Sequence, residues 1–84
     1  ENQKQLAVAI KSDGNVFMGQ NWVPKDNLKA QFEQVHSDTP DKEVMIKADR
    51  RLKYKDVRNV MRLINEAGFS RVGLVVDKEK TGGA

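Results

Sequence analysis

The sequence predicts an α/β fold of the α+β type: a two-layer sandwich with two helices on one face of a mixed sheet. Three observations lead to this prediction. Apolar residues alternate with a period of two in several separate stretches, which is typical of strands. Two stretches between them repeat apolar residues at helical spacing. The resulting order, ββ(β)αβαβ, ends in a strand–helix–strand unit, whose strands need a right-handed crossover if they are adjacent and parallel.

The first two strands form a predicted hairpin. The run QLAVAIK alternates larger and smaller apolar residues, and Asp13-Gly14 follows it as a strong turn signal. A two-residue turn at that pair would place Ile10 opposite Phe17 on the returning strand. A further turn at GQN leads to a short third strand, which Pro24 ends because proline has no N–H to donate.

The spacing then predicts a helix from about residue 25 to residue 36. Leu28, Phe32 and Val35 recur at i, i+4 and i+7, so they form one stripe along that helix. The polar stretch SDTPD ends it. We therefore expect the first helix to pack through this single stripe.

The strand–helix–strand unit occupies the second half of the chain. The run VMIKA alternates as a strand, and YKDVRNVMRLINEAG carries a continuous apolar stripe at helical spacing. Gly68 takes the position just after the helix, where a left-handed backbone conformation is common. A last strand is predicted over residues 71–77, and residues 77–84 are expected to form a disordered tail.

These stripes define one expected core and one domain, residues 1–84. A chain of 84 residues buries roughly 60% of its unfolded surface, so it can fold alone with modest stability. The core is expected to draw on apolar residues from every element: Leu6 or Val8, Ile10, Phe17, Leu28, Phe32, Val35, Val44, Ile46, Val57, Val60, Met61, Ile64, Val72 and Leu74.

Composition excludes several classes of protein. With 38% hydrophobic and 32% charged residues, the sequence is that of a folded domain rather than a disordered segment. The absence of cysteine excludes disulfides and thiolate metal sites. No apolar run approaches the ~20 residues of a membrane span. The sequence begins at Glu1 without a methionine, so we expect it to be part of a longer protein.

No pattern indicates catalysis, a cofactor or a bound metal. His36 is the only imidazole and lies at the polar end of a predicted helix, where a cation suits the helix dipole. The serines have no evident base and suit turns or caps. Arg50, Arg51 and Lys53 stand between Asp49 and Asp56, so a charge-compensated turn explains these carboxylates better than a catalytic pair does.

One feature stands out as a candidate binding site: seven basic residues lie within the sixteen positions 47–62. Five of them are candidate residues for binding a partner: Arg50, Arg51, Lys55, Arg58 and Arg62. They would attract an acidic polymer or protein. The alternative is a solvated face that Asp49, Asp56 and Glu66 partly compensate. Nucleic acid is not the expected partner, since Tyr54 is the only nearby aromatic residue for base stacking.

The segment VMIKADRRLKYKDVRNVMRLINEAGFSRVGLV resembles the periplasmic domain of the ExbD/TolR family of biopolymer-transport proteins, and the ExbD side more than the TolR side. The likeness is carried by Ala48-Asp49-Arg50, Tyr54 with Val57, Val60-Met61, Ala67-Gly68-Phe69 and Val72-Gly73-Leu74-Val75. The upstream segment AIKSDGNVFMGQNWV resembles the family's first hairpin. The likeness covers nearly the whole chain, and its C-terminal half is the more specific part.

This resemblance implies a function without catalysis. The parent protein would carry one helix in the bacterial inner membrane, with a protonatable aspartate outside this sequence, and the present domain in the periplasm. It would form a homodimer, assemble with an ExbB/TolQ-like channel protein and use the proton-motive force. It would energise a TonB/TolA-like protein for active transport across the outer membrane or envelope maintenance, and peptidoglycan is a further candidate partner.

Four residues of the shared pattern have expected structural roles. Gly68 would end the second helix with a left-handed cap. Gly73, within a strand, would mark the close approach of a helix or a second backbone. Tyr54 would anchor the start of the helix, with its hydroxyl bound to water or backbone. Asp49 belongs to the turn before that helix.

Two other classes of function stay open at the level of sequence. A small ligand-sensing module would need a pocket lined by polar groups, and no such cluster is evident. A nucleic-acid-binding module would use the basic run, and its binding would weaken steeply with salt. If the domain serves transport, as the family resemblance implies, an edge strand of the mixed sheet is expected to bind an extended segment of the TonB/TolA-like partner.

Overall fold

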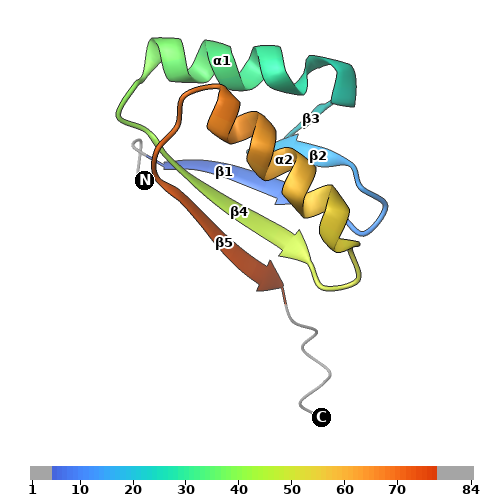
Figure 1. The fold of residues 1–84 in the computed structure, drawn as a ribbon. Coiled ribbons are helices and arrows are strands. Elements are labelled where there is room, and N and C mark those ends of the chain that lie inside the picture. Colours follow the sequence, from blue (N-terminus) through green and yellow to red (C-terminus); the bar gives the residue numbers. More distant parts are fainter. Residues whose placement is uncertain (1–4, 78–84) are drawn as a thin grey trace.

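The computed structural model describes residues 5–77 and has two helices packed on one face of a five-stranded mixed sheet (Figure 1). The elements are β1 (Gln5–Ile10), β2 (Val16–Met18), β3 (Asn21–Val23), the short 3₁₀ helix η1 (Lys25–Asn27), α1 (Leu28–Asp38), β4 (Glu43–Asp49), α2 (Tyr54–Glu66) and β5 (Val72–Asp77). The spatial order is β3-β2-β1-β4-β5, with antiparallel pairing from β3 to β1 and parallel pairing of β1 with β4 and of β4 with β5. The predicted fold class is confirmed.

The register of the first hairpin differs from the prediction by one residue. Ile10 is paired with Val16, and Phe17 is paired with Ala9. Because neighbouring residues of a strand point to opposite faces, this shift turns Val16 toward the helices and Phe17 toward the open face of the sheet. Val16 is accordingly 1% exposed, whereas Phe17 is half-buried beside Trp22, its pair on β3.

The cause of this shift is a hairpin loop of three residues rather than two. The Lys11 N–H donates to the Asn15 carbonyl oxygen at 2.9 Å, and the Gly14 N–H donates to the Lys11 carbonyl oxygen at 2.8 Å. The Asp13 carboxylate accepts from the Asn15 N–H at 3.0 Å, and Gly14 has a φ of 91°. This is the three-residue hairpin in which a glycine forms a bulge after the turn.

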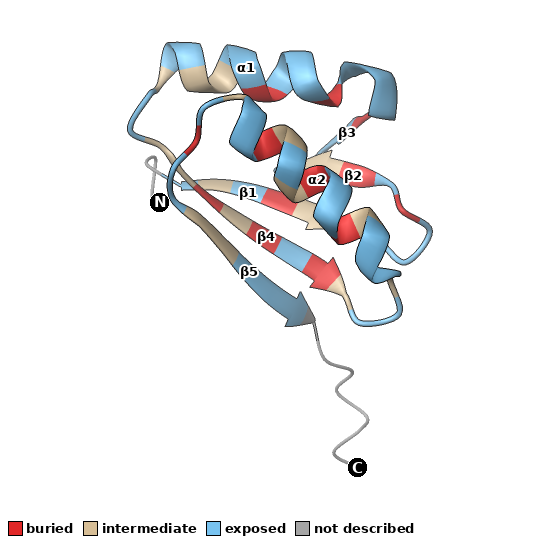
Figure 2. Cartoon of the chain, in the orientation of Figure 1, coloured by how far each residue is buried: buried red, intermediate tan, exposed pale blue. Residues whose placement is uncertain are grey.

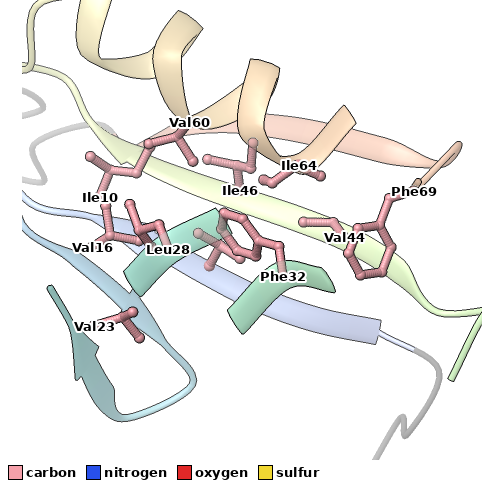
Figure 3. Packing of buried hydrophobic residues seen from close by; sticks show 11 residues of the cluster. Ile10, Val16, Val23, Leu28, Phe32, Val44, Ile46, Val60, Ile64 and Phe69 are labelled. Atoms are coloured by element: carbon pink, nitrogen blue, oxygen red, sulfur yellow. The ribbon is translucent and has the colours of Figure 1, made fainter. Parts of the chain in front are cut away.

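The core lies between the helices and the middle of the sheet (Figure 3). Its buried cluster consists of Val8, Ile10, Val16, Val23, Leu28, Phe32, Val44, Ile46, Val60, Ile64 and Phe69. Of the other predicted core residues, Val57 is buried, and Leu6, Val35, Met61 and Val72 pack against the cluster while partly exposed. Leu74 was predicted wrongly, because it is 41% exposed. Val16, Val23 and Phe69 belong to the core without having been predicted.

Gly68 ends α2 as the sequence predicts. Its φ is +113°, and its N–H donates to the Asn65 carbonyl oxygen at 3.1 Å. The His36 ring from α1 lies over it, so that a Cβ atom placed on Gly68 would lie 2.7 Å from the His36 Cε1 atom. The same ring meets Phe69 edge to face, with centroids 5.0 Å apart. His36 thus joins the two helix ends.

The last strand corrects two predictions. The closest atoms to a Cβ placed on Gly73 would be the Met45 Cε and Sδ atoms, at 3.1 and 3.2 Å, so a side chain rather than a helix or a second backbone approaches this glycine. Asp77, predicted both as the end of the last strand and as the start of the tail, is the last residue of β5 and is paired with Asp49, so the tail cannot begin there. The rest of the predicted tail, residues 78–84, lies outside the described residues.

Candidate docking surface

The turn after β4 holds Asp49, Arg50 and Arg51. The Asp49 carboxylate accepts from the Arg51 Nε and NH2 groups at 3.0 and 3.1 Å, and from the Arg51 backbone N–H at 2.8 Å. The hydrogen bonds from the Arg51 side chain, and to a smaller extent the one from its backbone N–H, lower the pKa of Asp49 to about 2. Arg51 is therefore engaged with its own turn, as the sequence-based reading of a charge-compensated turn expected.

Arg58 and Arg62 lie one turn apart on α2, and both line the hollow between this helix and the start of β5. Arg62 also lines a second hollow on the other flank of the helix, next to Gly14 and Asp56. The Arg58 guanidinium lies 5.6 Å from the centroid of the Tyr54 ring, a cation–π contact. Tyr54 itself is 69% exposed, so its ring supports Arg58 at the surface. Lys55 is exposed two turns before Arg62 on the same helix, and it does not line this hollow.

A groove of about 640 Å³ runs between this side of α2 and the start of β5. Its lining consists of Tyr54, Arg58, Asn59, Met61, Arg62, Asn65, Phe69, Ser70 and Val72. Met61, Phe69 and Val72 are buried or half-buried and form an apolar floor, while Arg58 and Arg62 are exposed at the rim. The groove thus combines apolar surface with two positive charges.

β5 borders this groove and forms one edge of the sheet. Leu74, Val75 and Val76 are 41, 48 and 50% exposed, respectively. They are consecutive, so the strand presents apolar side chains on both faces of the sheet. On its outer side, β5 has no strand partner within the described part of the chain, and its backbone groups there are open to pairing.

Such a surface can bind an extended segment. An added strand would take main-chain hydrogen bonds from β5 and cover its apolar side chains. Among the residues that the structure describes, no group of three or more His, Asp or Glu side chains is arranged to hold a metal ion. Within the same part of the chain, neither helix is long and apolar enough to cross a membrane.

Sequence reasoning found part of this surface. Of the five basic residues it singled out for binding, Arg58 and Arg62 line the groove, and Arg50, Arg51 and Lys55 lie outside it. Tyr54, which also lines the groove, was predicted only as an anchor of the helix start. It missed Phe69 and Ser70 in the groove and the exposure of β5. The run GLVVD carried a signal for that exposure, because three consecutive apolar residues cannot all face the single helical layer.

Comparison with known proteins identifies the family. The family model described as "Biopolymer transport protein ExbD/TolR" matches residues 1–79. The "Biopolymer transport protein ExbD" of Aquifex aeolicus is 30% identical over 77 residues, which cover 92% of this chain and 56% of that protein. The ExbD protein of Escherichia coli is 23% identical over 73 residues, covering 87% of this chain and 52% of that protein. The chain spans about half the length of these relatives. It belongs to the ExbD/TolR family of biopolymer transport proteins.

Proposed function

We propose that this chain is the periplasmic domain of an inner-membrane accessory protein that couples the proton-motive force to transport. In this proposal the domain performs no catalysis. It forms a homodimer and docks a TonB- or TolA-like protein, while an ExbB- or TolQ-like channel protein contacts a membrane segment outside this sequence. Membership of the ExbD/TolR family supports the proposal.

The exposed edge of β5 is the observation that carries the docking role. Natural sheets usually protect their edges with short strands, charges or proline. The opposite edge follows that rule, since β3 has three residues and Pro24 follows it directly. β5 has six residues and three exposed aliphatic side chains. An edge of this kind favours pairing with another strand, so we assign docking to β5.

Two copies of β5 can pair antiparallel around a two-fold axis. Opposed residues must share a face of the sheet, which allows pairing centred on Leu74 or on Val75. Centring on Leu74 places Val72 of one copy opposite Val76 of the other, and centring on Val75 places Leu74 opposite Val76. Either arrangement covers exposed apolar surface and extends the sheet across both copies.

Single cysteines test the homodimer directly, because the chain has no cysteine of its own. Residues paired across an antiparallel ladder have Cα atoms about 4.5–5.5 Å apart, within the range that a disulfide bridges. We expect Leu74→Cys or Val75→Cys to form an intermolecular disulfide under mild oxidation. Trp22→Cys on β3, where the side chain is 56% exposed, is the matched control. Crosslinking of the control alone would contradict pairing through β5.

Partner docking is tested by NMR with the periplasmic segment of a TonB- or TolA-like protein from the same organism. We expect amide shifts to concentrate along β5 and to begin at micromolar to millimolar segment concentrations. Because β5 is the only long open edge in the described sheet, the segment and the second copy should compete for it. Shifts confined to α1 or to the β2–β3 hairpin would rule out this docking site.

A further inference from the structure

The described part of the chain does not neutralise Arg58 and Arg62. Ion pairs elsewhere join Lys29 to Glu66 at 3.7 Å and Arg71 to Glu43 at 3.3 Å. No carboxylate of the described residues lies within ion-pair distance of either guanidinium at the groove. The Tyr54 ring holds the Arg58 guanidinium at the rim, which reduces the side-chain entropy lost when an anion binds.

A second copy of β5 would not supply the missing negative charge. Its side chains on the helix side are those of Val72, Leu74 and Val76, in register with the buried Val44, Ile46 and Ala48 of β4. In an antiparallel pair these aliphatic groups would again face the helix layer, beside the groove. The guanidinium groups of Arg58 and Arg62 would then lie beside aliphatic side chains without a negative partner. A strand that carries acidic side chains is therefore favoured over a second copy of β5 in that position.

The spacing of the two arginines matches the repeat of a strand. Four residues of a helix rise by about 6 Å. Alternate residues of a strand, which point to the same face, are about 6.6 Å apart. Figure 1 shows α2 running alongside the sheet in the direction opposite to β4 and β5. Acidic side chains at positions i and i+2 of a strand added to β5 would therefore reach both guanidinium groups.

We propose that the groove between α2 and β5 selects an extended acidic segment of another protein, with Asp or Glu at alternate positions held by Arg58 and Arg62. Aliphatic residues between these acids would lie on the open face of the sheet, beside Val75. The proposal rests on strand addition at β5 from the proposed function and adds the chemistry of the segment. Adjacent acids would not serve, because one of each pair would point to the open face.

Two synthetic peptides of equal composition test this selection. In one, glutamate and valine alternate strictly; in the other, the glutamates stand in adjacent pairs. A third peptide, with threonine in place of glutamate, reports strand addition without charge. Affinities are measured by fluorescence anisotropy at low salt, and binding positions by amide shifts. We expect the alternating peptide to bind roughly fivefold or more tightly than the paired isomer, with shifts along β5.

Charge reversal locates the effect on the groove. Arg58→Glu and Arg62→Glu should each remove most of the preference for the alternating peptide. Lys55→Glu is the matched control, since it makes the same change in charge on the same helix without lining the groove. The control variant should keep the preference. Added salt should weaken binding of the alternating peptide more than that of the threonine peptide.

Four results would overturn the proposal, and the first two leave strand addition itself standing. Equal affinities for the two acidic peptides, with shifts along β5, would leave strand addition standing and remove the acidic selection. A loss of preference in Lys55→Glu as large as in Arg58→Glu would reduce the effect to net charge. Absence of shifts along β5 with every peptide, including the threonine one, would contradict both the selection and the docking edge. A dimer that pairs through β5 at every protein concentration would contradict both as well, because no edge would stay open for the peptide.

Discussion

β4 and β5 are neighbouring parallel strands that both turn apolar residues toward the helix layer, yet β4 is buried there and most of β5 is exposed (Figure 2). Ile46 of β4 is 0% exposed, whereas Leu74, its pair on β5, is 41% exposed. Ala48 is 2% exposed and its pair, Val76, is 50% exposed. These pairs share a face of the sheet, so the difference comes from the helix layer: α2 covers β4 and leaves β5 outside it.

This difference separates the part of the apolar surface that folds the chain from the part that is left for binding. Buried β4 side chains contribute to stability through transfer from water and close packing. The exposed β5 side chains contribute little in a single copy, and an uncovered apolar edge favours association. The comparison therefore predicts that matched substitutions on the two strands affect different measurements.

The largest expected effect is on stability, from truncation of the buried strand. Ile46→Ala should lower the free energy of unfolding by about 2–5 kcal/mol, and Ile64→Ala, which truncates the side chain on α2 that packs in the same core, should fall in the same range. Leu74→Ala should lower it by less than about 1 kcal/mol in dilute solution. Urea denaturation measures all three. Equal losses for Ile46→Ala and Leu74→Ala would mean that β5 is covered in solution.

Gly68 begins the connection that carries the chain from α2 to β5, and its substitution should have the next largest effect. Gly68→Ala should cost about 1–3 kcal/mol, because φ is +113° and the new Cβ would meet the His36 ring. His36→Ala in the same chain should recover the part of the cost due to this contact. Gly19→Ala, where φ is +65° and no atom lies within 4 Å of the Cβ, is the control for backbone cost alone. An unchanged cost in the double variant would show that the ring moves away freely.

Asp49 ends β4, and its titration should report on the turn that leads into α2. Its pKa is lowered from 3.8 to about 2 by Arg51, so the ionised form stabilises the fold. That contribution is present above about pH 4 and is lost as the pH falls toward about 2. NMR titration of the carboxyl carbon should give the low value, and Arg51→Ala should raise it toward 3.8.

The matched control for that titration is Arg71→Ala, which removes a basic residue paired with Glu43 instead. Its Asp49 pKa should equal that of the unsubstituted chain. If both variants shifted the pKa of Asp49 equally, general charge rather than the hydrogen bonds from Arg51 would control it.

The smallest expected effect concerns Gly73 on β5. Gly73→Ala should change the free energy of unfolding by no more than about 0.5 kcal/mol. The new Cβ would lie 3.1 Å from the Met45 Cε atom, at the flexible end of a half-buried side chain that can move, while alanine restricts the unfolded chain. Thermal unfolding measures the change. A loss above 1 kcal/mol would restore the prediction that a rigid group packs against this glycine.

Much of the fold could be predicted because local signals agreed with one another. The helical stripe through Val57, Val60 and Ile64, with Gly68 after it, fixed α2 and its buried side. The hairpin register could not be predicted, since Asp13-Gly14 suits loops of two or three residues and the Asp13–Asn15 hydrogen bond selects the longer one. On the candidate surface, the basic side of α2 was recognised in the sequence, whereas β5 was predicted as a strand but its exposure was missed.

The sequence by itself determined the order of the elements and the side of each element that is apolar, because periodicity and turn residues act within a few positions of the chain. Only the tertiary structure decided which of these apolar faces are covered. Coverage depends on where α2 lies across strands that are distant in sequence, and two helices do not span five strands. The tertiary structure therefore left β5 and the side of α2 with Arg58 and Arg62 as the surface open to a partner.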